Sequence, residues 1–181
     1  ALVMSKPDLF RYEWIWEKSR TAGFLNAKNA PLKKHESVLV FSKGTTANGS
    51  KRRMSYFPQG LKEINEVKKS VKQNNNTVVG SRPSRNKPYI AKYTGYPNSI
   101  LRFNNEPKQI HPTQKPVASF EYLIKTYTNE GETVLDNCIG SGTTAIAALN
   151  TGRFFIGIEK EKEYVDIANK RIEEHQEKAL A

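Results

Sequence analysis

Cysteine is nearly absent from this sequence of 181 residues, which holds only Cys138. One cysteine cannot form an internal disulfide, so a disulfide-stapled secreted domain is excluded and a reducing compartment suits the chain. No neighbouring residue in the sequence would activate the thiol. We therefore expect Cys138 to be a small apolar residue rather than a nucleophile.

Long apolar runs are absent too, and no signal peptide is visible in the sequence. No stretch approaches the roughly 20 apolar residues that a membrane helix needs. The three histidines, His35, His111 and His175, are too dispersed to form a metal site. The sequence therefore predicts neither a membrane-embedded nor a metal-centred function.

Acidic residues are scarce in the first 110 residues, which hold 21 Lys and Arg against 7 Asp and Glu, so 21 − 7 = +14. Residues 111–181 hold 8 Lys and Arg against 11 Asp and Glu, so 8 − 11 = −3. A basic region concentrated in one part of a chain is typical of a surface that binds a phosphate backbone. It predicts nucleic-acid binding that weakens steeply with salt, rather than a generic basic surface.

Two segments among the first 43 residues have the character of strands. Tyr12–Lys18 alternates aromatic and charged residues, which predicts a strand. Glu36–Ser42 is a short continuous apolar run, which predicts a strand buried on both faces, as in a parallel sheet. The segment between them, Arg20–Lys34, contains Gly23 and Pro31 and is expected to be a loop.

Residues 44–110 are polar, basic and poorly periodic, apart from a short helix expected at Leu61–Val71. Aromatic residues interleave with the charges, and for most of them we expect a small local core rather than stacking on bases. We interpret this segment as an inserted recognition region. The residues expected to contact DNA are Lys51, Arg52, Arg53, Arg82, Arg85 and Lys87.

The last third of the chain has a regular pattern of helices and strands. Pro116 suits the first turn of a helix, which Gly131 would terminate. Strands are expected at Thr133–Asp136 and Phe154–Glu159, with a helix at Thr143–Thr151 between them and an amphipathic helix at 161–177 after them. A strand–helix–strand unit of this kind implies a right-handed crossover between parallel strands.

A glycine turn joins the first of these strands to its helix. Gly140 and Gly142 would let the backbone pass close to a ligand without an intervening side chain. Thr143 and Thr144 open the helix, whose free N–H groups favour an anion such as a carboxylate or a phosphate. The segment therefore predicts a pocket for a nucleotide-like small molecule.

Two carboxylates flank the predicted pocket. Asp136 stands at the end of the first strand, where it could meet an amino or ammonium group of a ligand. Glu159 follows by 159 − 136 = 23 residues at the end of the next strand, where it could accept both hydroxyls of a ribose. The glycine spacing alone also matches an NAD fingerprint, but the position of Asp136 and the short chain after Glu159 weigh against NAD.

Three motifs together resemble the β-group of DNA amino-methyltransferases, the N6-adenine and N4-cytosine enzymes that use S-adenosylmethionine. They are His-Pro-Thr-Gln-Lys-Pro at 111–116, Val-Leu-Asp-x-x-x-Gly-Ser-Gly-Thr-Thr at 134–144, and Phe-Ile-Gly-Ile-Glu at 155–159. Upstream, Tyr12–Lys18 and residues 35–42 resemble the family's segments beside its target-recognition region, as does Tyr96-Pro-Asn-Ser-Ile-Leu-Arg-Phe103.

The resemblance implies roles for individual residues. Asp136 and the glycine turn would hold the methionine moiety, Glu159 the ribose hydroxyls, and Lys115 the methionine carboxylate. The full set of cofactor-binding residues implied is His111, Thr113, Gln114, Lys115, Asp136, Asn137, Cys138, Gly140, Ser141, Gly142, Thr143, Thr144 and Glu159.

The chain departs from the family pattern in two places. The family has Pro-Phe after its motif Asp, where this chain has Asn137-Cys138, so aromatic area for stacking the cofactor's adenine is lost. The family's catalytic motif, (Asp/Asn/Ser)-Pro-Pro-(Tyr/Phe), supplies acceptors for the target amine and a ring that stacks on the flipped base. This chain contains no Pro-Pro, and we reject Asn86-Lys-Pro-Tyr89 as a substitute.

The resemblance implies an α/β, Rossmann-like S-adenosylmethionine-dependent methyltransferase fold with three layers and a mostly parallel sheet, incomplete in this chain. Residues 1–43 would belong to the core, 44–110 to the recognition insert and 111–181 to the cofactor-binding part. The absent catalytic strand would lie between the strands at Tyr12–Lys18 and Thr133–Asp136, whose edges would otherwise be exposed. We therefore expect the upstream part on a second polypeptide or in preceding residues.

The expected function is that of a cytoplasmic, bacterial or phage-encoded DNA methyltransferase of a restriction–modification system. It would transfer a methyl group from S-adenosylmethionine to a base amine of double-stranded DNA, with adenine N6 favoured over cytosine N4. A DNA-binding remnant without catalysis is the main alternative, and an NAD-dependent oxidoreductase is a third. The sequence leaves the oligomeric state open, a homodimer included.

Overall fold

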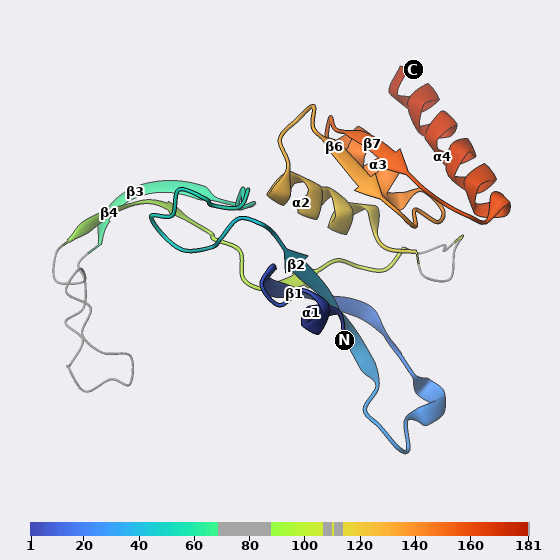
Figure 1. Ribbon diagram of the computed structural model, residues 1–181, viewed down its shortest axis with the longest axis horizontal. Helices are drawn as coiled ribbons and strands as arrows, with labels where there is room; N and C mark the ends of the chain where they lie inside the picture. The colour runs from blue at the N-terminus through green and yellow to red at the C-terminus, as the bar shows by residue number, and fades with distance from the viewer. Residues whose placement is uncertain (69–87, 107–109, 111–113, 181) are drawn as a thin grey trace. The chain divides into compact units, whose positions relative to one another are not determined.

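Figure 1 shows the computed structural model of the chain, which describes residues 1–68, 88–106, 110 and 114–180. The chain divides into two compact units. Ala1–Phe57 and Asn98–Ala181 form the first, and Pro58–Pro97 form the second. The second unit lies within the segment 44–110 that the sequence assigns to an insert, although the exact boundaries of that insert stay a prediction.

The upstream part of the first unit is built on a three-stranded sheet in the order β2-β1-β5. The strands are β1 (Phe10–Ala22), β2 (Lys33–Phe41) and β5 (Ile100–Arg102), with a short helix α1 (Leu2–Ser5) before β1 and a 3-10 turn η1 (Phe24–Asn26) between β1 and β2. Alternate side chains of β1, Trp14 and Trp16, are buried with Val40 and Leu101, because successive residues of a strand point to opposite faces. The predicted strand at Tyr12–Lys18 is confirmed.

The structure corrects two expectations for this region. Among the described residues, β2 pairs with β1 alone and antiparallel to it, and Val40 is the one buried residue of β2. The prediction of a parallel strand buried on both faces was therefore wrong. A short connection between consecutive strands forces antiparallel pairing, which the apolar run itself does not reveal. The expected loop is also shorter, since β1 continues to Ala22 and β2 begins at Lys33.

The second unit contains a two-stranded antiparallel ribbon, β3 (Lys62–Lys68) and β4 (Tyr89–Thr94). The helix predicted at Leu61–Val71 was therefore wrong over residues 62–68, and residues 69–71 lie outside the described part. Cross-strand pairing outweighs the weak helical periodicity of so short a segment. Asn65 has φ +49° beside a register shift between Glu63 and Glu66, which marks a bulge in β3.

The last third follows the predicted order. Its elements are α2 (Val117–Tyr127), β6 (Thr133–Asp136), α3 (Thr143–Asn150), β7 (Phe154–Gly157) and α4 (Lys162–Leu180). β6 and β7 are parallel and in register from Thr133–Phe154 to Asp136–Gly157. The predicted strand–helix–strand unit is thus confirmed, with element ends shifted by at most three residues.

A hydrogen-bond cluster links the upstream sheet to α2. The indole N–H of Trp14 donates to the hydroxyl of Tyr127 at 2.6 Å, and the hydroxyls of Tyr12 and Tyr127 lie 3.0 Å apart. Burial is the main cause that raises the pKa of Tyr127, so its hydroxyl stays protonated and remains both donor and acceptor. These hydrogen bonds hold the carboxyl end of the helix at Val117–Tyr127 against the upstream sheet.

One face of the β6–β7 pair carries a core and the other does not. Val134 and Phe155 pack against Ile124 of α2 and Ala147 and Ala148 of α3. On the opposite face Leu135, Phe154 and Ile156 remain 63%, 68% and 54% exposed. Within the described residues, the β6–β7 pair therefore has a helical layer on one side, where the complete predicted fold has one on each.

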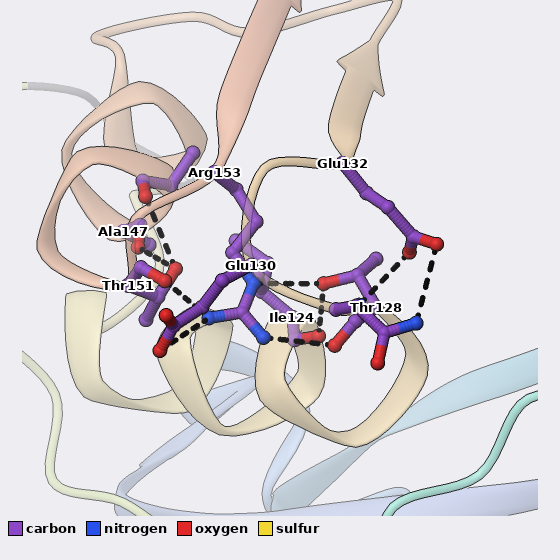
Figure 2. Close-up of polar contacts among 9 residues, drawn as sticks. Ile124, Thr128, Glu130, Glu132, Ala147, Thr151 and Arg153 are labelled. Carbon is purple, nitrogen blue, oxygen red and sulfur yellow. Dashed lines mark hydrogen bonds and ion pairs between the residues drawn. The ribbon is translucent and has the colours of Figure 1, made fainter.

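Arg153 ties together the ends of the strands and helices opposite the glycine turn (Figure 2). Its side chain, only 7% exposed, donates to the carbonyl of Thr128 at 2.8 Å, to the hydroxyl of Thr128 at 3.1 Å and to the carbonyl of Thr151. Glu130 approaches the guanidinium only at 4.0 Å and is 86% exposed. Arg153 thus satisfies carbonyls at the carboxyl ends of both α2 and α3, and of the two residues Thr151 is buried and Thr128 partly buried.

Replacing Arg153 by alanine should lower the free energy of unfolding by about 3 kcal/mol, because one buried carbonyl, one partly buried carbonyl and a hydroxyl lose their donor. Chemical denaturation monitored by circular dichroism measures the change. Glu130→Ala is the matched control and should cost less than about 0.5 kcal/mol, because its ion pair is long and solvated. Equal losses for the two variants would contradict a structural role for the Arg153 hydrogen bonds.

Candidate functional site

The turn between β6 and α3 needs glycine for two separate reasons. Gly140 and Gly142 have φ of +53° and +83°, a region that residues with a Cβ rarely adopt. A Cβ on Gly142 would also lie 3.1 Å from the Cβ of Ala168, because α4 packs directly against the start of α3. At Gly142 the close approach in this structure is to α4. The predicted approach of the turn to a ligand stays a prediction.

Asp136 holds the turn from the end of β6. One carboxylate oxygen accepts the backbone N–H of Cys138 at 3.0 Å, and the other accepts the hydroxyl of Thr144. A carboxylate offers about four acceptor positions, so these two bonds leave capacity for a ligand's ammonium group. The sequence predicted only the ligand contact, and the structure adds a role in positioning the turn.

Glu159 holds the same turn from the end of β7. Its Oε2 accepts the N–H of Gly140 at 2.9 Å, and its Oε1 accepts the N–H groups of Lys160 and Glu161 at 2.9 and 3.1 Å. The backbone N–H of Ile139 also donates to the carbonyl of Ile158 at 3.0 Å. The two acidic residues singled out in the sequence therefore lie on either side of one short turn.

The start of α3 is almost completely enclosed. Ser141, Thr143 and Thr144 are at most 7% exposed, whereas Asn137 and Cys138 are exposed to solvent. The first N–H groups of a helix have no partner within it, so this end carries a partial positive charge. That charge would favour an anionic group, and the expectation that a ligand places one there stays a prediction.

Arg171 is a residue of this site that sequence reasoning missed. Its guanidinium donates to the carbonyl of Ser141 at 2.5 Å and lies 3.3 Å from the hydroxyl of the same residue. Burial lowers the pKa of Arg171 from its ordinary value, and Glu106 and Glu174 oppose that shift. The sequence offered one indication of this contact. Arg171 lies three residues after Ala168 in the predicted last helix, so both residues are on the same face of that helix.

Lys115 lies in a second cluster, together with Glu36 and Lys18. Glu36 accepts from Lys115 at 2.5 Å and from Lys18 at 3.3 Å, and the Lys115 ammonium lies 5.4 Å from the ring centroid of Trp16. Burial raises the pKa of Glu36, but the hydrogen bonds from Lys115 and Lys18 lower it by more. The cation assigned by sequence to a cofactor carboxylate thus already binds a carboxylate of the protein.

A polar cavity of about 340 Å³ borders this cluster. Lys18, Glu36, Gln114 and Lys115 are among the side chains that line it. Gln114 is buried, and its side-chain oxygen accepts the N–H of Ile110 at 2.9 Å. His111 and Thr113, two further residues of the predicted cofactor site, lie outside the described residues.

Of the six residues predicted to contact DNA, the structure describes three. Lys51, Arg52 and Arg53 are exposed, and Arg53 donates to the side chain of Asn48 at 3.3 Å. The other three, Arg82, Arg85 and Lys87, lie outside the described residues. Among the residues that are described, no group of His, Cys, Asp and Glu could hold a metal ion, and no helix is long and apolar enough to cross a membrane.

The site belongs to a recognisable class of α/β protein. A parallel strand–helix–strand unit with a glycine turn, and with carboxylates at the carboxyl ends of both strands, is the architecture that binds nucleotide-like ligands. A comparison with family models then gives the particular family. The chain belongs to the DNA methylase family of N6 and N4 methyltransferases, whose model matches residues 5–170.

Relatives in this family are type II methyltransferases. The chain is 32% identical to M2.LlaDCHI of Lactococcus lactis subsp. cremoris over 87% of its own length and 48% of that protein. It is 31% identical to M.HpaI of Haemophilus parainfluenzae over 77% of its length and 38% of that protein. A shorter match to M2.DpnII of Streptococcus pneumoniae is 52% identical over 67 residues, or 37% of this chain and 25% of that protein. The chain thus spans half or less of these relatives.

Solved structures with the same fold are also methyltransferases. The complex of M1.HpyAVI with S-adenosylmethionine superposes with a TM-score of 0.54 at 26% identity, covering 90% of this chain and 62% of that one. The cytosine-N4-specific PvuII DNA methyltransferase superposes with a TM-score of 0.60 at 17% identity, covering 94% and 55%. The fold is therefore that of S-adenosylmethionine-dependent DNA methyltransferases, as the sequence predicted.

Gly142→Ala should lower the free energy of unfolding by about 2–3 kcal/mol, because it combines an unfavourable φ with crowding against Ala168. Urea denaturation measures the loss. Gly131→Ala is a suitable control, because Gly131 has φ +78° but open space where a Cβ would stand. The control should lose about 1 kcal/mol. If both variants lose the same amount, the close approach of α4 contributes nothing.

Glu36→Gln should remove a pH-dependent contribution to stability. The pKa of Glu36 in the folded protein lies below its ordinary value of 4.5, so the contribution is complete above that pH and is lost as the pH falls through the folded pKa. Near neutral pH we expect the variant to be about 1 kcal/mol less stable, because the pair is partly exposed. Urea denaturation at a series of pH values should show this gap closing in acid, and a gap that widens there would disprove the assignment.

Proposed function

We propose that the chain binds S-adenosylmethionine at the turn between β6 and α3. The observation that carries this proposal is the pairing of Asp136 and Glu159 on either side of an enclosed helix start, in a chain that belongs to the DNA methylase family. The complex of M1.HpyAVI with S-adenosylmethionine is a structural relative and supports the same ligand. An NAD-dependent oxidoreductase has no such support.

The residues present fit the parts of this cofactor. Asp136 has acceptor positions left for the ammonium group of its methionine moiety. The N–H groups at the start of α3 favour its carboxylate, and Gly140 and Gly142 keep side chains out of the way. The ribose hydroxyls donate to the Oε1 of Glu159 and replace the N–H groups of Lys160 and Glu161 there. Both of these residues are exposed, so their N–H groups can bind water instead.

Lys115 assists from the second cluster. An ammonium group has three N–H donors, and one of them binds Glu36, so Lys115 keeps donors for the cofactor carboxylate. Gln114 lies beside it, and His111 and Thr113 are proposed to complete this side of the site. Asn137 and Cys138 are exposed after Asp136, and their small side chains give the cofactor's adenine little area to stack on.

We propose that the protein is a DNA methyltransferase and that adenine N6 is its target. The cofactor supplies an electrophilic methyl group, so the work of the protein is mainly to position the base amine and to exclude water. Lys51, Arg52 and Arg53 provide exposed positive charge for the phosphate backbone, and Arg82, Arg85 and Lys87 are proposed to extend it. The domain boundaries 1–43, 44–110 and 111–181 are part of the same proposal.

Catalysis requires, in this proposal, a polypeptide segment that carries the catalytic Pro-Pro motif. The motif is absent from the 181 residues. Two features support a complementary segment. Leu135, Phe154 and Ile156 form an uncovered apolar face, and β6–β7 and β2-β1-β5 are separate sheets within the described residues. A strand inserted between the two sheets would satisfy the edges of both.

Transfer of tritiated methyl groups to duplex DNA tests the proposal. The chain alone should be inactive, and the chain mixed with a polypeptide that carries the upstream motif should label DNA. Nucleoside analysis of the product then separates N6-methyladenine from N4-methylcytosine. DNA binding without transfer under every condition would favour a remnant without catalysis.

Binding of S-adenosylhomocysteine, measured by calorimetry, tests the cofactor site separately. Glu159→Gln should weaken this binding at least tenfold, because a neutral amide is a poorer acceptor for two hydroxyls than a carboxylate. Glu161→Gln is the control, since Glu161 offers only its backbone N–H to the turn. Tighter binding of NAD than of S-adenosylhomocysteine would contradict the proposal.

A further inference from the structure

The hairpin between β1 and β2 carries a feature that the cofactor site does not use. β5 pairs with β1 only at residues 15–17, whereas β1 and β2 remain paired as far as Ala22 and Lys33. Beyond Glu17 no third strand among the described residues pairs with the hairpin, although Ser19 is still hydrogen-bonded to Asn105. The ribbon ends in the turn η1 (Figure 1). We call residues 23–32 the hairpin tip.

Two large apolar side chains stand at the hairpin tip. Phe24 is 80% exposed and Leu25 is 99% exposed. Single exposed apolar residues are common on protein surfaces, whereas adjacent exposed apolar side chains form a patch of the kind that marks an interaction site. Neither side chain belongs to a core of the described chain.

The backbone of the hairpin tip is held by its own hydrogen bonds. Gly23 adopts φ +89°, which starts the turn, and its carbonyl accepts the N–H of Asn26 at 3.0 Å. The carbonyl of Phe24 accepts from Ala27 at 3.1 Å, and that of Asn26 accepts from Asn29 at 2.9 Å. Phe24 and Leu25 are thus presented on an ordered turn, which reduces the entropy lost when they are buried by a partner.

The charge around the hairpin tip indicates which partner it meets. Between Glu17 and Glu36 the chain has five basic residues and no acidic one: Lys18, Arg20, Lys28, Lys33 and Lys34. Lys18 and Lys34 form ion pairs with Glu36 and Glu17. Arg20, Lys28 and Lys33 form no ion pair with any described residue. Apolar side chains that lie between unpaired basic residues suit a partner that offers both an apolar stack and nearby negative charge. The stacked bases and the phosphates of DNA offer both.

We propose that the hairpin tip inserts Phe24 and Leu25 into the DNA base stack beside the target nucleotide, while Arg20, Lys28 and Lys33 bind the flanking phosphates. Apolar side chains of other DNA-binding proteins separate base steps in this way, and a base that leaves the helix opens a gap that such a side chain fills. The inference rests on the proposed action on DNA. It adds a residue-specific mechanism by which the duplex is opened.

Photocross-linking identifies what the hairpin tip touches. A benzophenone amino acid replaces Leu25 in the full chain, and in a control chain it replaces Met4, which is 77% exposed on α1. Each protein is irradiated with duplex DNA in the presence of the upstream polypeptide. Position 25 should cross-link to DNA bases and position 4 should not. Cross-linking of position 25 to a second copy of the chain or to the upstream polypeptide would overturn the proposal.

DNA affinity and base stacking give a second measurement. Phe24→Ala combined with Leu25→Ala should weaken DNA binding at least tenfold and abolish the fluorescence increase of a 2-aminopurine placed beside the methylated base. The slope of affinity against salt should not change, because neither residue carries charge. Lys28→Ala combined with Lys33→Ala should instead reduce that slope by about 0.9 per lysine.

The matched control is Leu2→Ala combined with Met4→Ala, which removes two exposed apolar side chains elsewhere. It should leave affinity and fluorescence unchanged, and all variants should melt as the original chain does. If the original chain neither binds nor methylates DNA, the proposed function itself fails. If it does both, and the tip variant behaves like the control, only the insertion of Phe24 and Leu25 is disproved.

Discussion

A single carboxylate fixes the geometry on which the whole site depends. Glu159 accepts the N–H of Gly140 and the N–H groups of Lys160 and Glu161. These bonds hold the turn after β6 against the end of β7. Asp136 closes the same turn from the other strand through Cys138 and Thr144. Charged acceptors form stronger hydrogen bonds than neutral ones, so the two acids shape the turn as well as placing negative charge beside it.

The rest of the first unit supports this turn from two sides. α4 packs so closely on Gly142 that a Cβ there would crowd Ala168, and Arg171 of the same helix donates to the carbonyl of Ser141. At the opposite ends of the strands, Arg153 joins the last turns of α2 and α3 (Figure 2). These contacts hold the turn in one conformation.

The sequence predicted the last third almost completely, because its apolar periodicity, glycine turn and proline-led helix all favour the same structure. It was less successful upstream. Glu36–Ser42 looked like a parallel core strand and pairs antiparallel with β1, and residues 62–68 looked helical and form a ribbon. Strand direction and pairing depend on partners distant in sequence, and short segments carry too little local preference to reveal them.

The amino-acid sequence alone determined the family, the position of the glycine turn and the two acids beside it, because those motifs are contiguous and each residue type has a definite chemical task. Only the tertiary structure decided how these residues are used. It paired Lys115 with Glu36 from a strand 79 residues away, brought Arg171 to the turn, and placed Phe24 and Leu25 at the end of the β1–β2 ribbon. Contacts between distant segments arise from packing, which no local pattern records.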